Sequence, residues 1–276
     1  VTSAAGQPTT YIFTPVQGAL KVASVSRALT STCAAASAKT FYDANGWVDY
    51  TLDWNGNKTD YSYDAAGKLL QVTSAAGTTS AATRVNTWNG NNLSVVTYLD
   101  ATGNAYVKVD YTYATGKASN RLASQTWTDL RLGGTRTTTY AYAFHPNGVL
   151  ASKTVTRTQP SPAASTVYTY DSLGNLVSIT NALGHVVAWS GHNGQGLPGR
   201  MTDANGTITD YAYDAKGTLD TATLYAPGGT RVTRFTFDHD RRITDIAYPD
   251  GRVDRLRYNA AGRLISAGNA LSEFVS

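Results

Sequence analysis

Carboxylate pairs are the residues of this chain whose types and spacing could support acid–base chemistry. Asp60 lies four residues before Asp64, and Asp238 lies two residues before Asp240. Two carboxylates held close together can serve as acid and base. Equivalent aspartates recur along the chain ahead of a glycine, however, and this pattern is typical of turns. We therefore predict that these carboxylates stabilise turns, that the chain has no catalytic residues, and that it is not an enzyme.

The other reactive side chains also lack partners at useful spacings. The histidines are His145, His185, His192 and His239. They form no metal-binding pattern with one another or with the single cysteine, Cys33, which also excludes an internal disulfide. The glycine-rich segment 191–196 lacks the lysine and helix of a phosphate loop. In the less regular region 80–165, no nucleophile, base and orienting group are visible together. We predict no metal site and no cofactor.

A five-residue pattern, Tyr-Asp-x-x-Gly, recurs along the chain and must be interpreted before any single residue. Its first two copies begin 21 residues apart. The pattern residues are Tyr42, Asp43 and Gly46; Tyr63, Asp64 and Gly67; Tyr170, Asp171 and Gly174; Tyr213, Asp214 and Gly217; and the variant Tyr258, Asn259 and Gly262. We predict a structural role for these residues, as turns of a repeat.

A second glycine-ended segment lies half a period after many of these copies. These segments are 53–56, 74–77, 100–103, 181–184 and 203–206. Asp, Asn or Ser at the first position and Gly at the fourth suit a type I turn that closes a hairpin. Each repeat therefore contributes two chain reversals.

The segments between the turns have the alternation of β-strands. Tyr61 and Tyr63 are separated by one small residue, as are Tyr211 and Tyr213, which places the paired aromatics on one face of a strand. After each turn the apolar residues are spaced by three, as at Leu69 and Val72, which indicates a β-bulge just past the glycine. We predict an all-β fold, a large antiparallel sheet of hairpin repeats.

The predicted number of strands has consequences for shape. About 24 to 26 strands at roughly 4.8 Å spacing would make a sheet about 120 Å wide. Twisted sheets wider than about ten strands curl, split or close. A closed cylinder of this width would be roughly 40 Å across, too wide for side chains to fill. We expect a segment of a hollow shell. A parallel β-helix is the competing architecture, but its coils bend rather than reverse.

The repeat also defines the expected organisation of the chain. We predict a degenerate N-terminal repeat segment at residues 1–41, a repeat array at 42–266 and a C-terminal tail at 267–276. Exposed loops are expected at 34–39, at Gly133 and Gly134, and at 159–164, which are rich in small residues or Pro. The chain begins with Val1, and its only methionine is Met201. We expect it to be a piece of a longer protein.

Charge and hydropathy exclude several classes of partner. The net charge is only +4, and aspartates interleave with the arginines between Arg231 and Arg263, so this region is not the dense basic patch of a nucleic-acid-binding protein. No apolar run reaches membrane-spanning length, and no signal peptide is visible. We expect neither nucleic acid as a partner nor a membrane span.

The repeat resembles that of Rhs/YD-repeat proteins. The similarity is carried by the tyrosine–aspartate–glycine turns followed by an apolar pair, best at 63–73, 170–180 and 258–264, with weaker copies at 88–89, 144–148 and 192–196. The resemblance implies a β-cocoon, as in insecticidal toxin complexes, interbacterial Rhs effectors and teneurins. It implies a structural shell segment of a larger protein, secreted or on the bacterial cell surface. The implied partners are the remaining shell repeats and an attached C-terminal effector or toxin domain. The Asp-Pro-x-Gly-Leu sequence that ends bacterial cores is missing.

The tryptophans support an alternative function. Aromatic rings on an exposed sheet can stack on sugars, which would make the chain an adhesion or carbohydrate-binding module. The candidate glycan-stacking residues are Trp47, Trp54, Trp88, Trp127 and Trp189. Cross-strand packing of the same residues is the simpler interpretation.

Overall fold

The computed structural model describes residues 8–27, 36–159, 161–268 and 274–275. Within these ranges the regular structure consists of β-strands and one 3₁₀ helix, η1 (Gly116–Ala118). The chain divides into two compact units, Val1–Thr139 and Tyr140–Ser276. The predicted all-β fold of antiparallel strands is confirmed. Cys33 lies outside the described residues.

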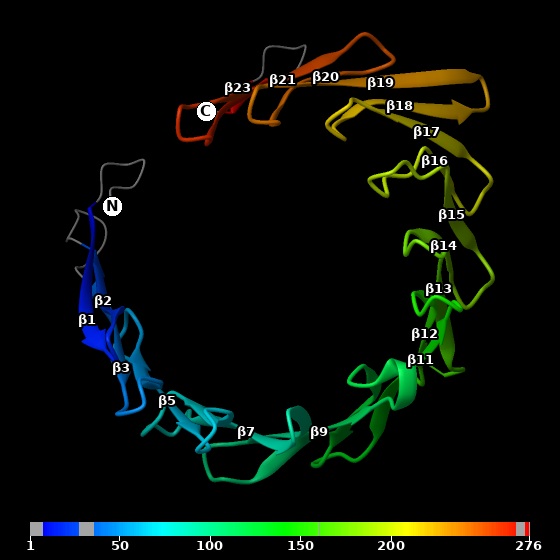
Figure 1. The fold of residues 1–276 in the computed structure, drawn as a ribbon. Helices are drawn as coiled ribbons and strands as arrows, with labels where there is room; N and C mark the ends of the chain where they lie inside the picture. The colour runs from blue at the N-terminus through cyan, green and yellow to red at the C-terminus, as the bar shows by residue number, and fades with distance from the viewer. Residues whose placement is uncertain (1–7, 28–35, 160, 269–273, 276) are drawn as a thin grey trace. The chain divides into compact units, whose positions relative to one another are not determined.

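In the first unit, successive strands pair side by side and antiparallel (Figure 1). The strands are β1 (Thr9–Val16), β2 (Ala19–Arg27), β3 (Ala36–Tyr42), β4 (Val48–Leu52), β5 (Lys58–Tyr63), β6 (Leu69–Ser74), β7 (Ala82–Asn89), β8 (Asn92–Leu99), β9 (Ala105–Tyr113) and β10 (Leu122–Asp129). The next strand, β11 (Thr135–Phe144), crosses the division between the units.

The second unit repeats the same arrangement, with antiparallel pairing from β12 to β23. Its strands are β12 (Leu150–Arg157), β13 (Ala164–Tyr170), β14 (Leu176–Thr180), β15 (Val186–Ser190), β16 (Arg200–Thr202), β17 (Ile208–Tyr213), β18 (Leu219–Ala226), β19 (Gly229–Phe237), β20 (Ile243–Ala247), β21 (Val253–Tyr258), β22 (Leu264–Gly268) and β23 (Phe274–Val275).

Because successive strands are antiparallel, the turns of each unit lie alternately at the two ends of its strands and form two rows. We call the row that carries the Tyr-Asp-x-x-Gly turns the motif edge and the other row the opposite edge. The predicted bulges are present: Ser62 pairs with Gln71 but Tyr63 with Leu69, which leaves Leu70 as the extra residue. The same shift of register occurs at the pairs of Tyr42, Tyr170, Tyr213 and Tyr258.

The two faces of the sheet differ as the alternation predicts. In β5 and β6, Tyr61 pairs with Val72 and Tyr63 with Leu69 on one face, which we call the aromatic face. Asp60 pairs with Thr73 on the other, the polar face, where the hydroxyls of Thr73 and Thr83 share a hydrogen bond of 3.0 Å.

Few side chains are fully buried. A row of mutually paired residues, Asn86, Val96 and Val109, crosses β7, β8 and β9. Their exposed fractions are 4%, 3% and 0%. Val155 is the other buried apolar residue among those described. The sheet is therefore held mainly by pairing and by contacts between neighbouring strands.

Two local predictions were wrong. The turn predicted at 74–77 is shifted by one residue, since Ser74 ends β6 and the turn bond joins Thr78 N to Ala75 O. The loop predicted at 34–39 is strand from Ala36 on, where β3 begins, and residues 34–35 lie outside the described residues. The weak copy at Trp88 has the register shift of the motif copies, but its turn is a tight hairpin in which Asn89 pairs with Asn92.

Candidate functional site

The turns of the motif edge are the most regular feature of the chain. In the first copy the Gly46 amide donates to the Asp43 carbonyl at 3.0 Å, and Gly46 has a φ of +81°, which glycine adopts without a steric penalty. Asp43 Oδ1 accepts hydrogen bonds from the amides of Asn45 and Trp47, both at 2.9 Å. The carboxylate thus organises the turn from within.

Aspartates of later copies make the same bonds, and their pKa values follow from them. The Asn175 side-chain amide, together with the backbone amides of Asn175 and Leu173, lowers the pKa of Asp171. The backbone amide of Thr218 is the main cause of a lowered pKa at Asp214. A carboxyl group with a lowered pKa carries no proton at neutral pH and is a weak base, so this geometry serves turn structure.

The carboxylates of the two candidate acid–base pairs are also already bound to other groups. Asp60 lies 2.7 Å from Lys58 Nζ, and Asp64 Oδ1 binds two amides of its own turn. Asp238 and Asp240 both bind the Arg242 guanidinium, at 2.7 and 2.6 Å. In both pairs the oxygens already bind cations or turn amides.

Several tyrosines at the motif edge tie their turn to the neighbouring strand. The Tyr258 hydroxyl donates to the Ile243 carbonyl at 3.0 Å, and pairing of β20 with β21 begins only at Asp245. Tyr42 reaches the Val22 carbonyl at 2.9 Å in the same way. The hydroxyl thus satisfies a carbonyl that lies beyond the end of the strand ladder. Tyr213 and Tyr113 make equivalent bonds to Pro198 and Leu93.

Consecutive turns of the motif edge contact one another. A Cβ added to Gly67 would lie 2.8 Å from Trp47 Cζ2, so the indole of one turn rests on the glycine of the next. A Cβ added to Gly196 would likewise lie 2.7 Å from Asn175 Oδ1, so the Asn175 side chain covers that glycine. A side chain at Gly67 would therefore have to displace the Trp47 indole, and one at Gly196 would have to turn the Asn175 amide away.

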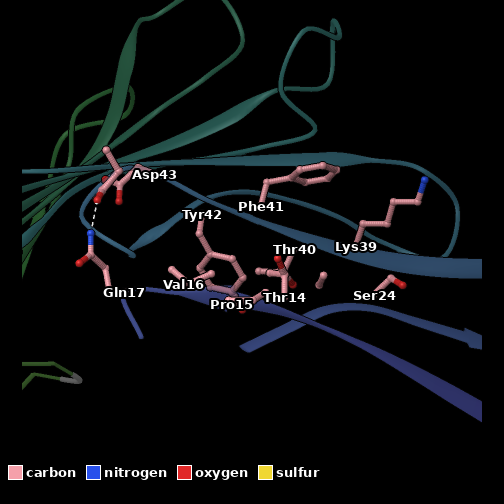
Figure 2. A pocket seen from close by; sticks show the side chains of 12 residues that line it. Thr14, Pro15, Val16, Gln17, Ser24, Lys39, Thr40, Phe41, Tyr42 and Asp43 are labelled. Atoms are coloured by element: carbon pink, nitrogen blue, oxygen red, sulfur yellow. Dashed lines mark hydrogen bonds between the residues drawn. The ribbon is translucent and has the colours of Figure 1, made fainter. Parts of the chain in front are cut away.

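Further contacts of this kind join other consecutive turns. Gln17 lies against Gly46, Gln195 against Gly217, and Arg242 against Gly262. Polar side chains also bond the backbone of the next turn. Figure 2 shows the Gln17 amide, which donates to the Ala44 carbonyl, and Lys21 donates to the Gly46 carbonyl at 2.6 Å. We call this arrangement, within each unit, the stacked motif turns.

Several residues of the stacked motif turns were missed by sequence reasoning. Arg241, with a φ of +63°, closes the turn after Phe237 in the place of glycine. His145 occupies the aspartate position of the weak copy at 144–148. The sequence did indicate that position, but not the contact of its Nε2 with the Tyr170 carbonyl at 2.9 Å. The contacting residue often directly follows a turn glycine, as Trp47 and Asn175 do. The position directly after a turn glycine could therefore have identified Trp47 and Asn175 as contacting residues.

The tryptophans lie in separate contacts. The Trp47 and Tyr63 ring centroids are 5.4 Å apart, and Trp88 Nε1 donates to the Leu69 carbonyl at 2.9 Å. The other three are in the turn after β4, in β10 and in β15: Trp54 lies 4.8 Å from Arg27, Trp127 stacks on Tyr98, and Trp189 pairs with Met201. Their role in glycan stacking stays a prediction.

The described residues contain no group of three or more His, Cys, Asp or Glu side chains arranged to hold a metal ion. They also contain no helix with the length and hydropathy of a membrane span.

Comparison with known proteins identifies the repeat. The family model described as RHS Repeat matches residues 42–79, which contain the first two motif turns. The resemblance to YD-repeat proteins is confirmed, and residues 42–79 form an RHS repeat. No curated protein sequence matches it.

Solved structures with a similar arrangement have low scores. The crystal structure of TcdB2-TccC3-Cdc42 matches with a TM-score of 0.45 and 15% identity, over 90% of this chain and 16% of that one. A Tc holotoxin pore from Photorhabdus luminescens matches with a TM-score of 0.44 and 15% identity, over 89% and 16%. A porin-like protein from Bacteroides uniformis has a TM-score of 0.29 and 11% identity, over 95% and 93%. The chain spans about a sixth of the length of the first two, at 16%.

Proposed function

We propose that this RHS-repeat chain forms part of the wall of a shell that encloses or presents an attached toxin or effector domain. The chain would be a non-enzymatic segment of a larger protein that is secreted or displayed on a bacterial surface. The observation that carries the proposal is the stacking of the motif turns.

A wall must resist bending without a solid core behind it. Strand pairing alone leaves a sheet free to twist and shear, because each ladder joins only neighbouring strands. The contact of Trp47 with Gly67 and the bond from Tyr42 to Val22 join whole hairpins along one edge. These links fix the angle between successive repeats within a unit while both faces stay open to contents or solvent.

Small-angle X-ray scattering of the purified chain tests this proposal. A curved wall gives a broader distance distribution than a compact globule of equal mass, with the dip of a trough or cavity. A rod-like or compact distribution would overturn the wall function.

A further inference from the structure

A groove with unpaired positive charge lies over β2, β3 and β4 in the first unit. It consists of two hollows, of about 660 and 510 Å³, that share Lys39. Figure 2 shows the first hollow, with Lys39 and Phe41 extending from the same strand. Ser26, Arg27, Leu52 and Trp54 line the second. We call both hollows together the Lys39 groove.

The cations of the Lys39 groove differ from the ion-paired cations of the described strands. Lys58, Lys108 and Arg200 each lie within 2.8 Å of an aspartate oxygen. Among the described residues, neither Lys39 nor Arg27 has a carboxylate within ion-pair distance. The second hollow is lined by no acidic residue.

Among the described residues that line the first hollow, Asp43 is the only acidic one. Its Oδ1 already accepts two amides of its own turn. The Lys39 groove therefore has an excess of positive charge that an anionic ligand would neutralise.

The aromatic rings of the Lys39 groove favour a peptide over a sugar. The Arg27 guanidinium lies 4.8 Å from the Trp54 ring and covers it. Phe41 stacks on Tyr50 at 4.2 Å, and Lys58 lies 4.6 Å over the same Tyr50 ring. Ring faces that a sugar would stack on are thus largely taken. What stays accessible is a set of ring edges, an aliphatic side chain at Leu52 and two cations.

We propose that the Lys39 groove binds an acidic, extended polypeptide segment. Lys39 pairs with Ser24, and Arg27 lies three residues beyond Ser24, so their backbones are roughly 10 Å apart along the strand direction. Carboxylates two or four residues apart lie on one side of an extended chain, about 7 or 13 Å from each other, and these distances bracket that separation. Apolar side chains of the segment contact Leu52 and Phe41. This inference is independent of the wall function.

The test is binding of a fluorescein-labelled peptide of alternating glutamate and leucine to the whole chain, measured by fluorescence anisotropy. Lys39→Gln and Arg27→Gln each weaken binding about two- to fivefold, the range for exposed ion pairs, and the double variant weakens it further. Lys117→Gln is the matched control, because Lys117 is exposed in η1 outside the groove. It leaves binding unchanged.

Three results would overturn the proposal. Equal binding of the matched glutamine–leucine peptide would show that charge is not recognised. Weakening by Lys117→Gln equal to that of Lys39→Gln would show a general charge effect. Tighter, Lys39-dependent binding of an oligogalacturonate of equal charge would show that the groove takes an acidic glycan instead.

Discussion

The turns on the two edges of the sheet share one local geometry but differ in what touches them. On the opposite edge, Asp53 and Asp100 bind the amides of their turns just as Asp43 does. Yet a Cβ added to Gly56 or Gly103 would meet nothing within 4 Å, whereas at Gly67 it would meet Trp47. The hydrogen bonds within a turn are therefore common to both edges, whereas close contacts of a turn glycine with the preceding turn occur at Gly67 but not at Gly56 or Gly103.

The bulges offer a physical reason for this difference. Most register shifts in the described pairings lie beside the motif edge, as at Ser62/Tyr63 and Ala212/Tyr213. The exceptions are Tyr98/Leu99 and Ile12/Phe13, which lies in the middle of its strand. A bulge bends its strand and increases the local twist. We infer that this bending brings side chains of consecutive motif turns onto the turn glycines. Opposite turns also make side-chain contacts, as Arg131 does with Asp100 at 2.6 Å, but Gly56 and Gly103 stay uncovered.

The sharpest test of the comparison is one substitution made on both edges. Gly67 and Gly56 have the same φ of +82°, so Gly67→Ala and Gly56→Ala share a backbone penalty of about 1 kcal/mol. Only Gly67→Ala must also displace the Trp47 indole, which adds about 1–3 kcal/mol. The measurement is the free energy of unfolding by urea denaturation. Equal losses would show that the turn-to-turn contact contributes nothing.

A smaller effect is expected from the tyrosine hydroxyls. Tyr42→Phe removes the bond to the Val22 carbonyl and should cost about 1 kcal/mol. Tyr61→Phe is the control on the same sheet, since the Tyr61 hydroxyl has no hydrogen bond among the described residues. Thermal unfolding of both variants checks this. If Tyr61→Phe lowered the melting temperature as much as Tyr42→Phe, the Tyr42 hydroxyl bond would not be what stabilises the fold.

The smallest effect should come from acid, and it should affect both edges. The Thr102 hydroxyl is the main cause that lowers the pKa of Asp100 to about 2, and the pKa of Asp171 on the motif edge is also lowered. A carboxyl with a lowered folded-state pKa stabilises the fold fully above its unfolded pKa, about 3.9. That stability is lost as the pH falls through the folded value.

Melting temperatures measured between pH 5 and about pH 2 test this dependence. Wild type should lose part of its advantage over Asp100→Asn below about pH 4, and most of it near pH 2. A difference between the two proteins that does not change with pH would show that ionisation of Asp100 does not matter.

Much of the fold was predictable because its signals are local. Asp43, Gly46 and the alternation around Tyr61 and Tyr63 each act within a few residues, so turns, strands and bulges could be read from them. Turns that use other residues were missed: Arg241 stands where glycine was expected, and the Tyr248–Gly251 turn has no Asp or Asn at its first position.

The sequence by itself determined the period, the all-β class, the hairpin turns and the side of each strand that is aromatic, because these depend on neighbouring residues. Only the tertiary structure decided that Trp47 rests on Gly67, that Tyr42 reaches Val22, and that Lys39 and Arg27 line one groove. The Trp47–Gly67 contact and the Tyr42–Val22 bond each join residues about twenty positions apart in the sequence. They depend on how far the strands between them bend, and the local pattern of residues gives the place of each bulge but not that angle.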